Sequence, residues 1–244
     1  MLSCGGFGSL TICVLCYGDN LQLAERFLQA LYKNTDPAAF RLRAGLNEVC
    51  STTSSLFSEY QRIHGNIDIF FEPKNIFKSP MMRRMFSNPS ISTDWIVWFD
   101  DDSYPTRSDW LQRLMLQIQR APHVAQWGEG HILWNRDTNT RMFIETAQWY
   151  CGKPIRNGLD SERVESMEFA FMTGGFWAIK TEVLRALNWP DPRLIQANDD
   201  FLLGEALRQN GYECGQFSRG VHVNTHARRN AQAWEINHLP PIAT

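Results

Sequence analysis

Hydrophobic and polar residues along the first half of the chain follow two alternating patterns. Short apolar runs rich in β-branched and aromatic residues have the length and composition of strands that are buried on both faces. Between these runs, apolar residues recur at the spacing of one helix face, as Phe27 and Leu31 do. The expected strands are residues 10–17, 40–49, 67–73 and 94–100, and the expected helices are residues 23–34, 51–65, 79–86 and 108–119.

Strands that alternate with helices predict a parallel sheet with helices on both sides. Two helix limits have signals of their own, because Gly65 is a typical helix stop and Ser79 before Pro80 is a typical helix start. In sheets of this kind, ligands bind at the carboxyl ends of the strands. The polar residues that follow the expected strands are therefore the first candidates for a functional site.

The second half of the chain has a different pattern. Aromatic, strand-like segments replace the regular alternation, and one of them is interrupted by Gly174 and Gly175. Two further helices are expected, one capped by Thr181 and one capped by Asn198. No linker separates the halves, so residues 1–244 are expected to form a single domain. The expected strands are residues 124–135, 141–150, 169–180 and 218–230, and the expected helices are residues 181–188 and 198–212.

The overall charge excludes one class of function. The chain has 24 Lys and Arg residues against 26 Asp and Glu, a formal net charge of −2, so it does not bind nucleic acid through overall charge. The apolar run at residues 10–17 is too short to cross a bilayer, and no membrane span is expected. Cys13 and Cys16 lie in an expected buried strand, which favours reduced, packed thiols and a cytoplasmic protein.

One stretch carries most of the candidate chemistry. An expected strand runs directly into Asp100, Asp101 and Asp102. If the chain stays extended, Asp100 and Asp102 share a face about 6–7 Å apart, and two like charges on one face favour a cation between them. A divalent metal held by carboxylates, water and substrate phosphates would meet that need. The alternative is a turn, because Asp102 and Ser103 are residue types that favour the start of a loop.

Three segments, taken in order, resemble the family 2 glycosyltransferases of the GT-A fold. They are the strand that ends in FDDDSYP, the segment MTGGFWAIKTEVLRALNWPDPR and the segment NDDFLLGEALRQNGY. The resemblance covers about residues 10–226 and implies an α/β fold, with a Rossmann-like, mostly parallel central sheet flanked by helices and a smaller β region on the acceptor side. It also implies a nucleotide-sugar-binding half at about 10–120, an acceptor-binding and catalytic half at about 121–230, and a tail at 231–244.

The resemblance implies a metal-dependent donor site at the three aspartates. Asp102 aligns with the family's metal contact and Asp100 with a position near the ribose and the metal, whereas Asp101 is a weaker donor-site candidate because it faces the other way. A histidine that follows the catalytic helix often completes the metal site in the family, which makes His222 the first candidate and His226 the second. Imidazole and carboxylate ligands together suit Mn²⁺ or Mg²⁺ as the cofactor.

The resemblance also assigns the chemistry. Asp200 aligns with the catalytic base of the family, and Asp199 is the alternative. In the first turn of a helix capped by Asn198, the helix dipole favours the charged form of both carboxylates. A charged carboxylate can accept the proton of the attacking acceptor hydroxyl. The implied reaction is an inverting transfer from a nucleoside-diphosphate sugar, with UDP-sugar favoured as the donor.

Further donor contacts are expected where the strands end. Leu15, Cys16 and Tyr17 would lie against the nucleotide base, mainly through backbone groups. Asn47 stands where the family often has an aspartate that reads the base, and its amide offers both a donor and an acceptor. Arg84 falls where the family has an arginine or asparagine that lines the donor site, although a solvated basic helix face is the alternative.

Two glycines and three tryptophans are candidates for contacts with the sugar or the acceptor. Gly174 and Gly175 would let a ligand approach the backbone closely. Trp127, Trp177 and Trp134 could stack on a sugar ring, and the first two are taken as acceptor-binding. The acceptor itself stays open, because a glycan, a protein, a small molecule or a modified DNA base all fit the sequence.

Three other functions remain open. A retaining transferase of the same fold would share the aspartates but lack a well-placed base. A nucleotidyltransferase on a similar fold would have an arginine-containing loop after the first strand, and this chain has CYGDNLQ there. A non-catalytic sugar-binding protein would be expected to have lost the aspartates. The anomeric configuration of the product separates the retaining transfer from the inverting one.

Overall fold

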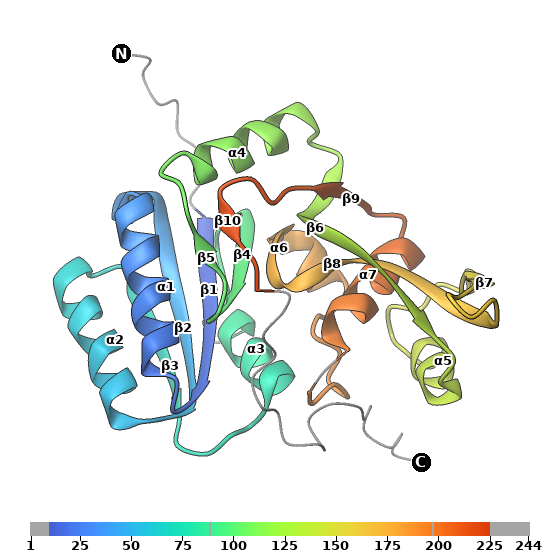
Figure 1. The fold of residues 1–244 in the computed structure, drawn as a ribbon, viewed down its shortest axis with the longest axis horizontal. Coiled ribbons are helices and arrows are strands. Elements are labelled where there is room, and N and C mark those ends of the chain that lie inside the picture. The colour runs from blue at the N-terminus through green and yellow to red at the C-terminus, as the bar shows by residue number, and fades with distance from the viewer. Residues whose placement is uncertain (1–9, 88, 197, 225–244) are drawn as a thin grey trace.

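The computed structural model of the chain describes residues 10–87, 89–196 and 198–224 (Figure 1). The strands are β1 (Leu10–Gly18), β2 (Phe40–Val49), β3 (Ile67–Glu72), β4 (Trp95–Asp100), β5 (Tyr104–Pro105), β6 (Val124–Asn135), β7 (Asn157–Leu159), β8 (Glu165–Lys180), β9 (Glu213–Gln216) and β10 (Val221–His222). The helices are α1 (Leu21–Asn34), the 3₁₀ turn η1 (Pro37–Ala39), α2 (Ser51–His64), α3 (Lys78–Ser87), α4 (Trp110–Arg120), α5 (Thr138–Glu145), α6 (Thr181–Ala186) and α7 (Asp199–Gln209).

The centre of the fold is one sheet with the strand order β3-β2-β1-β4-β8-β6-β9, and β7 pairs with β8 beside this path. Strands β1 to β4 run parallel, as the alternating pattern predicts, whereas β8 is antiparallel to both β4 and β6. The chain builds outward from β1 to β3 and then returns to place β4 on the other side of β1. This reversal of strand order lies between β1 and β4, and in open α/β sheets ligands bind at such a point.

Alternating side chains of the central strands divide the core into two parts. In β1, Ile12 and Val14 face the cluster that α1, α2 and α4 cover, whereas Cys13 faces the cluster that α3, α5, α6 and α7 cover. In β4 the same alternation places Phe99 in the first cluster and Trp98 in the second. Because both faces are covered, the strands are almost continuously apolar, and this is the pattern that identifies them in the sequence.

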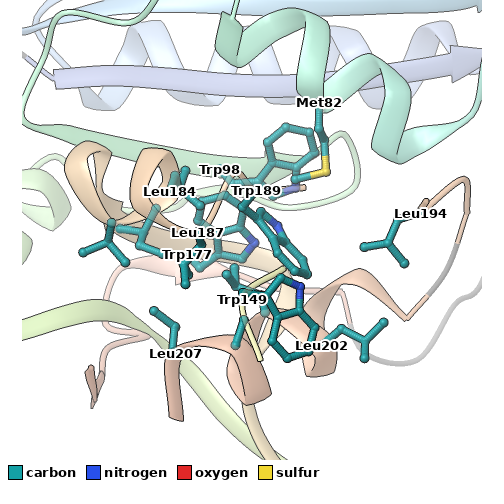
Figure 2. Packing of buried hydrophobic residues seen from close by; sticks show 14 of the residues in the cluster. Met82, Trp98, Trp149, Trp177, Leu184, Leu187, Trp189, Leu194, Leu202 and Leu207 are labelled. Carbon is teal, nitrogen blue, oxygen red and sulfur yellow. The ribbon is translucent and has the colours of Figure 1, made fainter. Parts of the chain in front are cut away.

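Tryptophans fill much of the second cluster, in which Figure 2 shows Trp98, Trp177, Trp149 and Trp189 together. The rings of Trp98 and Trp177 are stacked with their centroids 5.8 Å apart. Trp177 is 1 % exposed, and Trp127 in the first cluster is 5 % exposed. The expectation that Trp127 and Trp177 contact an acceptor is therefore wrong for this structure, because both rings are packed in the core.

Some expected elements differ from the observed ones. Residues 141–145 are helical and the residues up to 149 form turns instead of a strand, because α5 begins after Asp137, whose side chain accepts a hydrogen bond from the backbone N–H of Asn139. The last expected strand is reduced to the two residues of β10, and residues beyond 224 lie outside the described part of the chain. Three smaller elements, α5, β7 and β9, have short or weak sequence patterns, so contacts with the surrounding fold determine their secondary structure.

Three expected helix caps also differ. Ser79 lies inside α3, which begins one residue earlier, and Thr181 is the first helical residue of α6 instead of its cap. Asn198 does stand at the cap position of α7, but its backbone is left-handed, with φ 62°, and its side chain makes no capping hydrogen bond. The helix stop at Gly65 is confirmed, with φ 70°. No helix in the described residues is long and apolar enough to cross a membrane.

Candidate functional site

The three aspartates lie where β4 ends. The strand stops at Asp100, and the N–H of Ser103 donates to the carbonyl oxygen of Asp100 at 3.0 Å, which closes a turn. Asp101 and Asp102 therefore belong to a turn, and the expectation of an extended chain in which Asp100 and Asp102 share a face is wrong. The side chain of Asp101 is buried, at 1 % exposed, and so it offers no direct contact to a nucleotide.

Asp100 lies at the reversal of strand order in the sheet. It pairs in register with Leu15 of β1, so the carboxyl ends of β1 and β4 are adjacent. The indole N–H of Trp98 donates to Asp100 Oδ1 at 3.0 Å, and Lys78 Nζ lies 3.4 Å from the same oxygen. These two contacts fix the carboxylate of Asp100 at the edge of the sheet where a ligand is expected.

Lys78 joins the two halves of the site. Its Nζ lies 3.4 Å from Asp100 Oδ1 and 3.3 Å from Asp199 Oδ2, so the first residue of α3 contacts both the end of β4 and the start of α7. Burial alone would lower the pKa of Lys78, but the negative charges of Asp100, Asp199 and Asp200 outweigh it and raise the pKa. The ammonium group is therefore held in its charged form among three carboxylates.

The backbone at the start of α3 is also tied to the segment before α7. The N–H of Lys78 donates to Gln196 Oε1 at 3.1 Å, and the N–H of Ser79 donates to the carbonyl oxygen of Ile195 at 3.1 Å. These bonds bring residues more than a hundred positions apart into contact. They explain how α3 and α7 present Lys78 and Asp199 to each other.

Asp199 and Asp200 occupy the first turn of α7. Asp199 is buried against Lys78, whereas Asp200 Oδ1 accepts a hydrogen bond from the N–H of Phe201 at 2.8 Å. Burial, followed by the charge of Asp199, raises the pKa of Asp200 to about 6, although Lys78 partly opposes the shift. Desolvation thus outweighs the helix dipole, which would favour the charged form.

The two glycines of β8 have different surroundings. A Cβ placed on Gly174 would lie 3.4 Å from Lys78 Nζ and 3.6 Å from Asp200 Oδ2, so the backbone of β8 lies close to these two groups and a methyl group would fit there in ordinary contact. A Cβ on Gly175 would lie 2.8 Å from both Ser103 Oγ and Val223 Cγ1. Gly174 therefore borders the site, whereas Gly175 permits close packing of β8, which corrects its expected role as a ligand contact.

The turn from Asp100 to Ser103, called the Asp turn below, is lined on its other side by β5 and β10. Asn224 Nδ2 donates to Asp102 Oδ2 at 3.3 Å, and Arg26 Nη2 lies 3.5 Å from the carbonyl oxygen of Asp102. Burial and the nearby charge of Asp100 raise the pKa of Asp102. Two negative groups thus meet at a half-buried place, where a cation would relieve their repulsion.

His222 lies next to this turn but does not complete a cluster of metal ligands. It pairs with Tyr104 across β5 and β10, and the two rings are 4.9 Å apart. His226 lies outside the described residues. Among the residues that the structure describes, no three His, Cys, Asp or Glu side chains form a group that could hold a metal ion. Mg²⁺ is commonly held by only one or two carboxylates together with water and substrate phosphates, so Asp100 and Asp102 fit that smaller protein contribution.

Asn47 supports a loop and is not open to a ligand. Its Oδ1 accepts from the N–H of Ile76 at 2.9 Å, and its Nδ2 donates to Asn75 Oδ1 at 2.8 Å. The residue is 2 % exposed. The expectation that Asn47 reads the nucleotide base is therefore wrong for this structure, because both ends of its amide bind the loop that leads to α3.

The remaining expected donor contacts are placed as follows. Arg84 forms an ion pair with Glu72 at the end of β3 and donates to the carbonyl oxygen of Phe71, so its guanidinium is already partnered. Leu15 and Cys16 are buried, so only their backbone could meet a nucleotide, and that contact stays a prediction. Tyr17 extends past the last residue pair between β1 and β4 and is partly exposed.

Sequence reasoning missed three residues of this site: Lys78, Asn224 and Arg26. Lys78 was missed because the helix was expected to begin at Ser79; in the structure Lys78 is the first residue of α3, where a lysine opposes the helix dipole and needs nearby negative charge. Asn224 and Arg26 carry no sequence signal, since their contacts with Asp102 depend on how distant segments come together.

Comparisons with known proteins agree with this architecture. Residues 8–238 match the family model Glycosyltransferase like family 2. No curated protein matches the chain. Among solved structures, the mannosyltransferase PcManGT from Pyrobaculum calidifontis, in complex with GDP-Man and Mn²⁺, aligns with a TM-score of 0.63 at 16 % identity over 94 % of this chain.

Two other solved structures share the fold. GalNAc-T7 with UDP, GalNAc and Mn²⁺ aligns with a TM-score of 0.60 at 11 % identity over 87 % of this chain. S. aureus TarS in complex with UDP-GlcNAc aligns with a TM-score of 0.52 at 13 % identity over 86 % of this chain. The chain spans 60 % of PcManGT, 44 % of GalNAc-T7 and 56 % of TarS. From the match over most of its length, the chain belongs to the Glycosyltransferase like family 2, and the sheet described above has the GT-A fold of the solved glycosyltransferases that it resembles.

Proposed function

We propose that this chain is a metal-dependent, inverting glycosyltransferase that moves a sugar from a nucleoside-diphosphate sugar to an acceptor hydroxyl. The observation that carries the proposal is the meeting of Asp100, Asp199 and Asp200 around Lys78 at the reversal of strand order. One carboxylate comes from the donor half of the chain and two come from the other half. A single displacement needs a base for the acceptor hydroxyl and stabilisation of the leaving group, and carboxylates from both halves are available for these two roles.

Asp102 and Asp100 would hold the divalent cation, with Mn²⁺ or Mg²⁺ as the expected ion. When bound, the cation would offset the negative charge of the leaving nucleoside diphosphate. The support is the raised pKa of Asp102, which reports burial together with like charge at a place that a cation would suit. The ring of His222 packs against the ring of Tyr104, which follows the turn closely in sequence. His222 is the proposed further ligand of the cation.

Asp200 is the proposed general base, and Asp199 is not. Asp199 is 6 % exposed and is engaged by Lys78, so it has no open approach to a substrate. Asp200 Oδ2 lies beside Gly174, whose lack of a side chain would let an acceptor hydroxyl approach it. A pKa of about 6 also suits a base that must be deprotonated near neutral pH and yet still accept a proton.

Lys78 is the proposed positioning residue of the site. Its ammonium group holds Asp199 and Asp100 together and lies beside Gly174. Removing it would leave buried carboxylates facing each other without a compensating charge. Lys78 would also place a fixed positive charge beside the donor phosphates, where it would favour an anion.

The donor is proposed to be a nucleoside-diphosphate sugar, with UDP-sugar tested first and GDP-sugar second. S. aureus TarS binds UDP-GlcNAc and PcManGT binds GDP-Man, so this fold accommodates either base. Because the Asn47 amide is used within the chain, the base would be selected by the backbone at Leu15 to Tyr17. The acceptor class stays open among a glycan, a protein, a small molecule and a modified DNA base.

The proposal is tested by thermal unfolding with UDP, GDP, dTDP and CMP, each with and without Mn²⁺. We expect one nucleotide to stabilise the protein only when the metal is present, and we expect Asp102→Asn to abolish that effect. Glu162→Gln, which alters an exposed carboxylate in the loop before β8, is the control and should behave as wild type. Stabilisation that is equal with and without metal would contradict the metal site, and a product that keeps the donor's anomeric configuration would contradict inversion.

A further inference from the structure

A cavity lies between α3 and α6, away from the Asp turn. It has a volume of about 180 Å³. The cavity is lined by the C-terminal end of α3, whereas Lys78 lies at the N-terminal end of this helix. A helix of this length spans about 15 Å. On β4 it is reached at Ile96, about 13 Å before Asp100 along the strand. The residues that line it include Arg83, Ile96, Thr181, Leu184, Arg185 and Trp189.

Two buried polar groups at this cavity have no partner. Thr181 is 3 % exposed and Trp189 is 4 % exposed, yet neither Thr181 Oγ1 nor Trp189 Nε1 has a hydrogen-bond partner among the described residues. The backbone N–H of Trp189 donates to the carbonyl oxygen of Leu184 at 2.9 Å, and Leu184 also lines the cavity. Buried donors without a partner are costly and uncommon in native proteins. Neither atom is open to the cavity in this conformation, so a ligand would accept their hydrogen bonds after a small shift of the two side chains.

Two positive charges at the cavity meet no carboxylate. Arg83 donates to the carbonyl oxygen of Asn188 at 3.0 Å and to that of Pro190, and Arg185 donates to the carbonyl oxygen of Ile91 and to Ser90 Oγ at 3.4 Å. All of these acceptors are neutral. In the described part of the chain, neither guanidinium forms an ion pair. The cavity is thus positively charged, although the chain as a whole has a net charge of −2.

We propose that this cavity binds a small oxyanion, namely a phosphate group. The guanidinium groups of Arg83 and Arg185 would supply the charge, and Thr181 and Trp189 would supply the buried donors. A phosphate oxygen accepts several hydrogen bonds at once, and arginine recognises phosphate well. The volume is several times the share of one water molecule, about 30 Å³, but it is below the roughly 300 Å³ at which sites for larger ligands begin. The site is independent of the proposed donor site.

The test is calorimetric titration of the whole protein with inorganic phosphate, in the presence of EDTA and at constant ionic strength with chloride. EDTA keeps a metal-assisted donor site from contributing, and Asp102→Asn should leave phosphate binding unchanged. Arg185→Gln and Thr181→Val are the site variants, because one removes the charge and the other removes the hydroxyl at nearly constant volume. We expect each to weaken phosphate binding about tenfold or more.

Arg141→Gln is the matched control, since Arg141 is an exposed arginine on α5 that forms an ion pair with Glu145 on the same helix, four residues on. It should bind phosphate as wild type does. Binding of glucose 1-phosphate with the same variant pattern would mean that the phosphate group arrives on an organic molecule, whereas binding of inorganic phosphate alone would mean a free anion. No binding by wild type at millimolar phosphate, or binding that Arg185→Gln and Thr181→Val leave unchanged, would overturn the proposal and leave a cavity that holds only water.

Discussion

The ammonium group of Lys78 lies 3.3 Å from the carboxylate of Asp199, so the first residue of α3 is paired with the first residue of α7. Lys78 has a side-chain exposure of 16 % and Asp199 of 8 %, which places the pair mostly out of water. A charge pair in such a place is costly to break, because the remaining partner cannot be solvated. The pair therefore links the two halves of the chain at the candidate site.

Replacing Lys78 with Met should destabilise the fold and remove activity. Loss of the ammonium group leaves Asp100, Asp199 and Asp200 near one another with no compensating charge, and breaking a buried pair costs about 3 kcal/mol. We expect that loss in the free energy of unfolding, measured with urea. The control is Lys74→Met, an exposed lysine in the loop before α3. Equal stabilities of the two variants would contradict a structural role for Lys78.

Replacing Asp200 with Asn should separate activity from stability. A general base contributes about 10²- to 10⁴-fold to the rate, so transfer to the acceptor should fall by that factor. Because burial raises the pKa of Asp200, its ionised form is unfavourable in the fold, and the neutral amide should leave the protein at least as stable as wild type at pH 7. Initial rates and urea unfolding measure the two effects. If Asp199→Asn lost more activity at unchanged stability, the roles of the two aspartates would be reversed.

The pH dependence of the reaction should follow the same carboxyl group. The pKa of Asp200 is raised to about 6 in the protein without substrate, and a base must be deprotonated to act. We expect kcat/KM to be lost as the pH falls through about 6, since this parameter reports the free enzyme. Wild-type stability should meanwhile decline as the pH rises toward 6, since the fold binds this proton more tightly than the unfolded chain does. A flat kcat/KM between pH 5 and 8 would contradict Asp200 as the base.

The sequence predicts the parallel half of the fold because that half is locally consistent. Strands such as β1 and β4 are buried on both faces, so almost every residue along them is apolar, and the pattern needs no knowledge of distant contacts. The position of Asp100 at the strand end follows directly. In contrast, residues 141–145 of α5 were expected to belong to a strand, because Phe143 and the aromatic residues Trp149 and Tyr150 that follow favour strands in isolation, and only the Asp137 cap and tertiary packing favour the helix.

The site itself could be predicted only in part. The aspartates were identified because carboxylates at a strand end need a cation or donors nearby. The burial of Trp177 and the use of Asn47 inside the chain could not be foreseen, because both depend on which segments pack above the strand ends. The role of Lys78 depends on the contact between α3 and α7, two helices more than a hundred residues apart in sequence.

The neighbouring glycines of β8 should respond differently to alanine. At Gly174 the added Cβ makes ordinary contacts with Lys78 and Asp200, so the fold should be unchanged, but the methyl group fills space that the substrates need. We expect a raised KM or a lowered kcat without loss of stability. At Gly175 the methyl group collides with Ser103 and Val223 at 2.8 Å, and crowding of this kind costs about 1–3 kcal/mol.

Thermal unfolding and initial rates of the two glycine variants provide the comparison, and each variant is the control for the other. Both changes add the same methyl group to the same strand, so a general effect of losing a glycine would appear in both. Should Gly174→Ala be fully active with unchanged KM, the position beside Asp200 at Gly174 would not be where substrate binds.

Replacing Asn47 with Leu should weaken the site without changing which nucleotide it selects. The amide of Asn47 binds Ile76 and Asn75, and these residues lead to Lys78. Loss of these bonds leaves buried backbone groups unsatisfied, at a cost of about 1–3 kcal/mol, and it loosens the loop that positions Lys78. We expect lower stability and weaker binding of every nucleotide by a similar factor, measured by calorimetry with UDP and GDP. A change in the ratio of the two affinities would instead mean that Asn47 contacts the base, and the loop contacts would then be secondary to recognition.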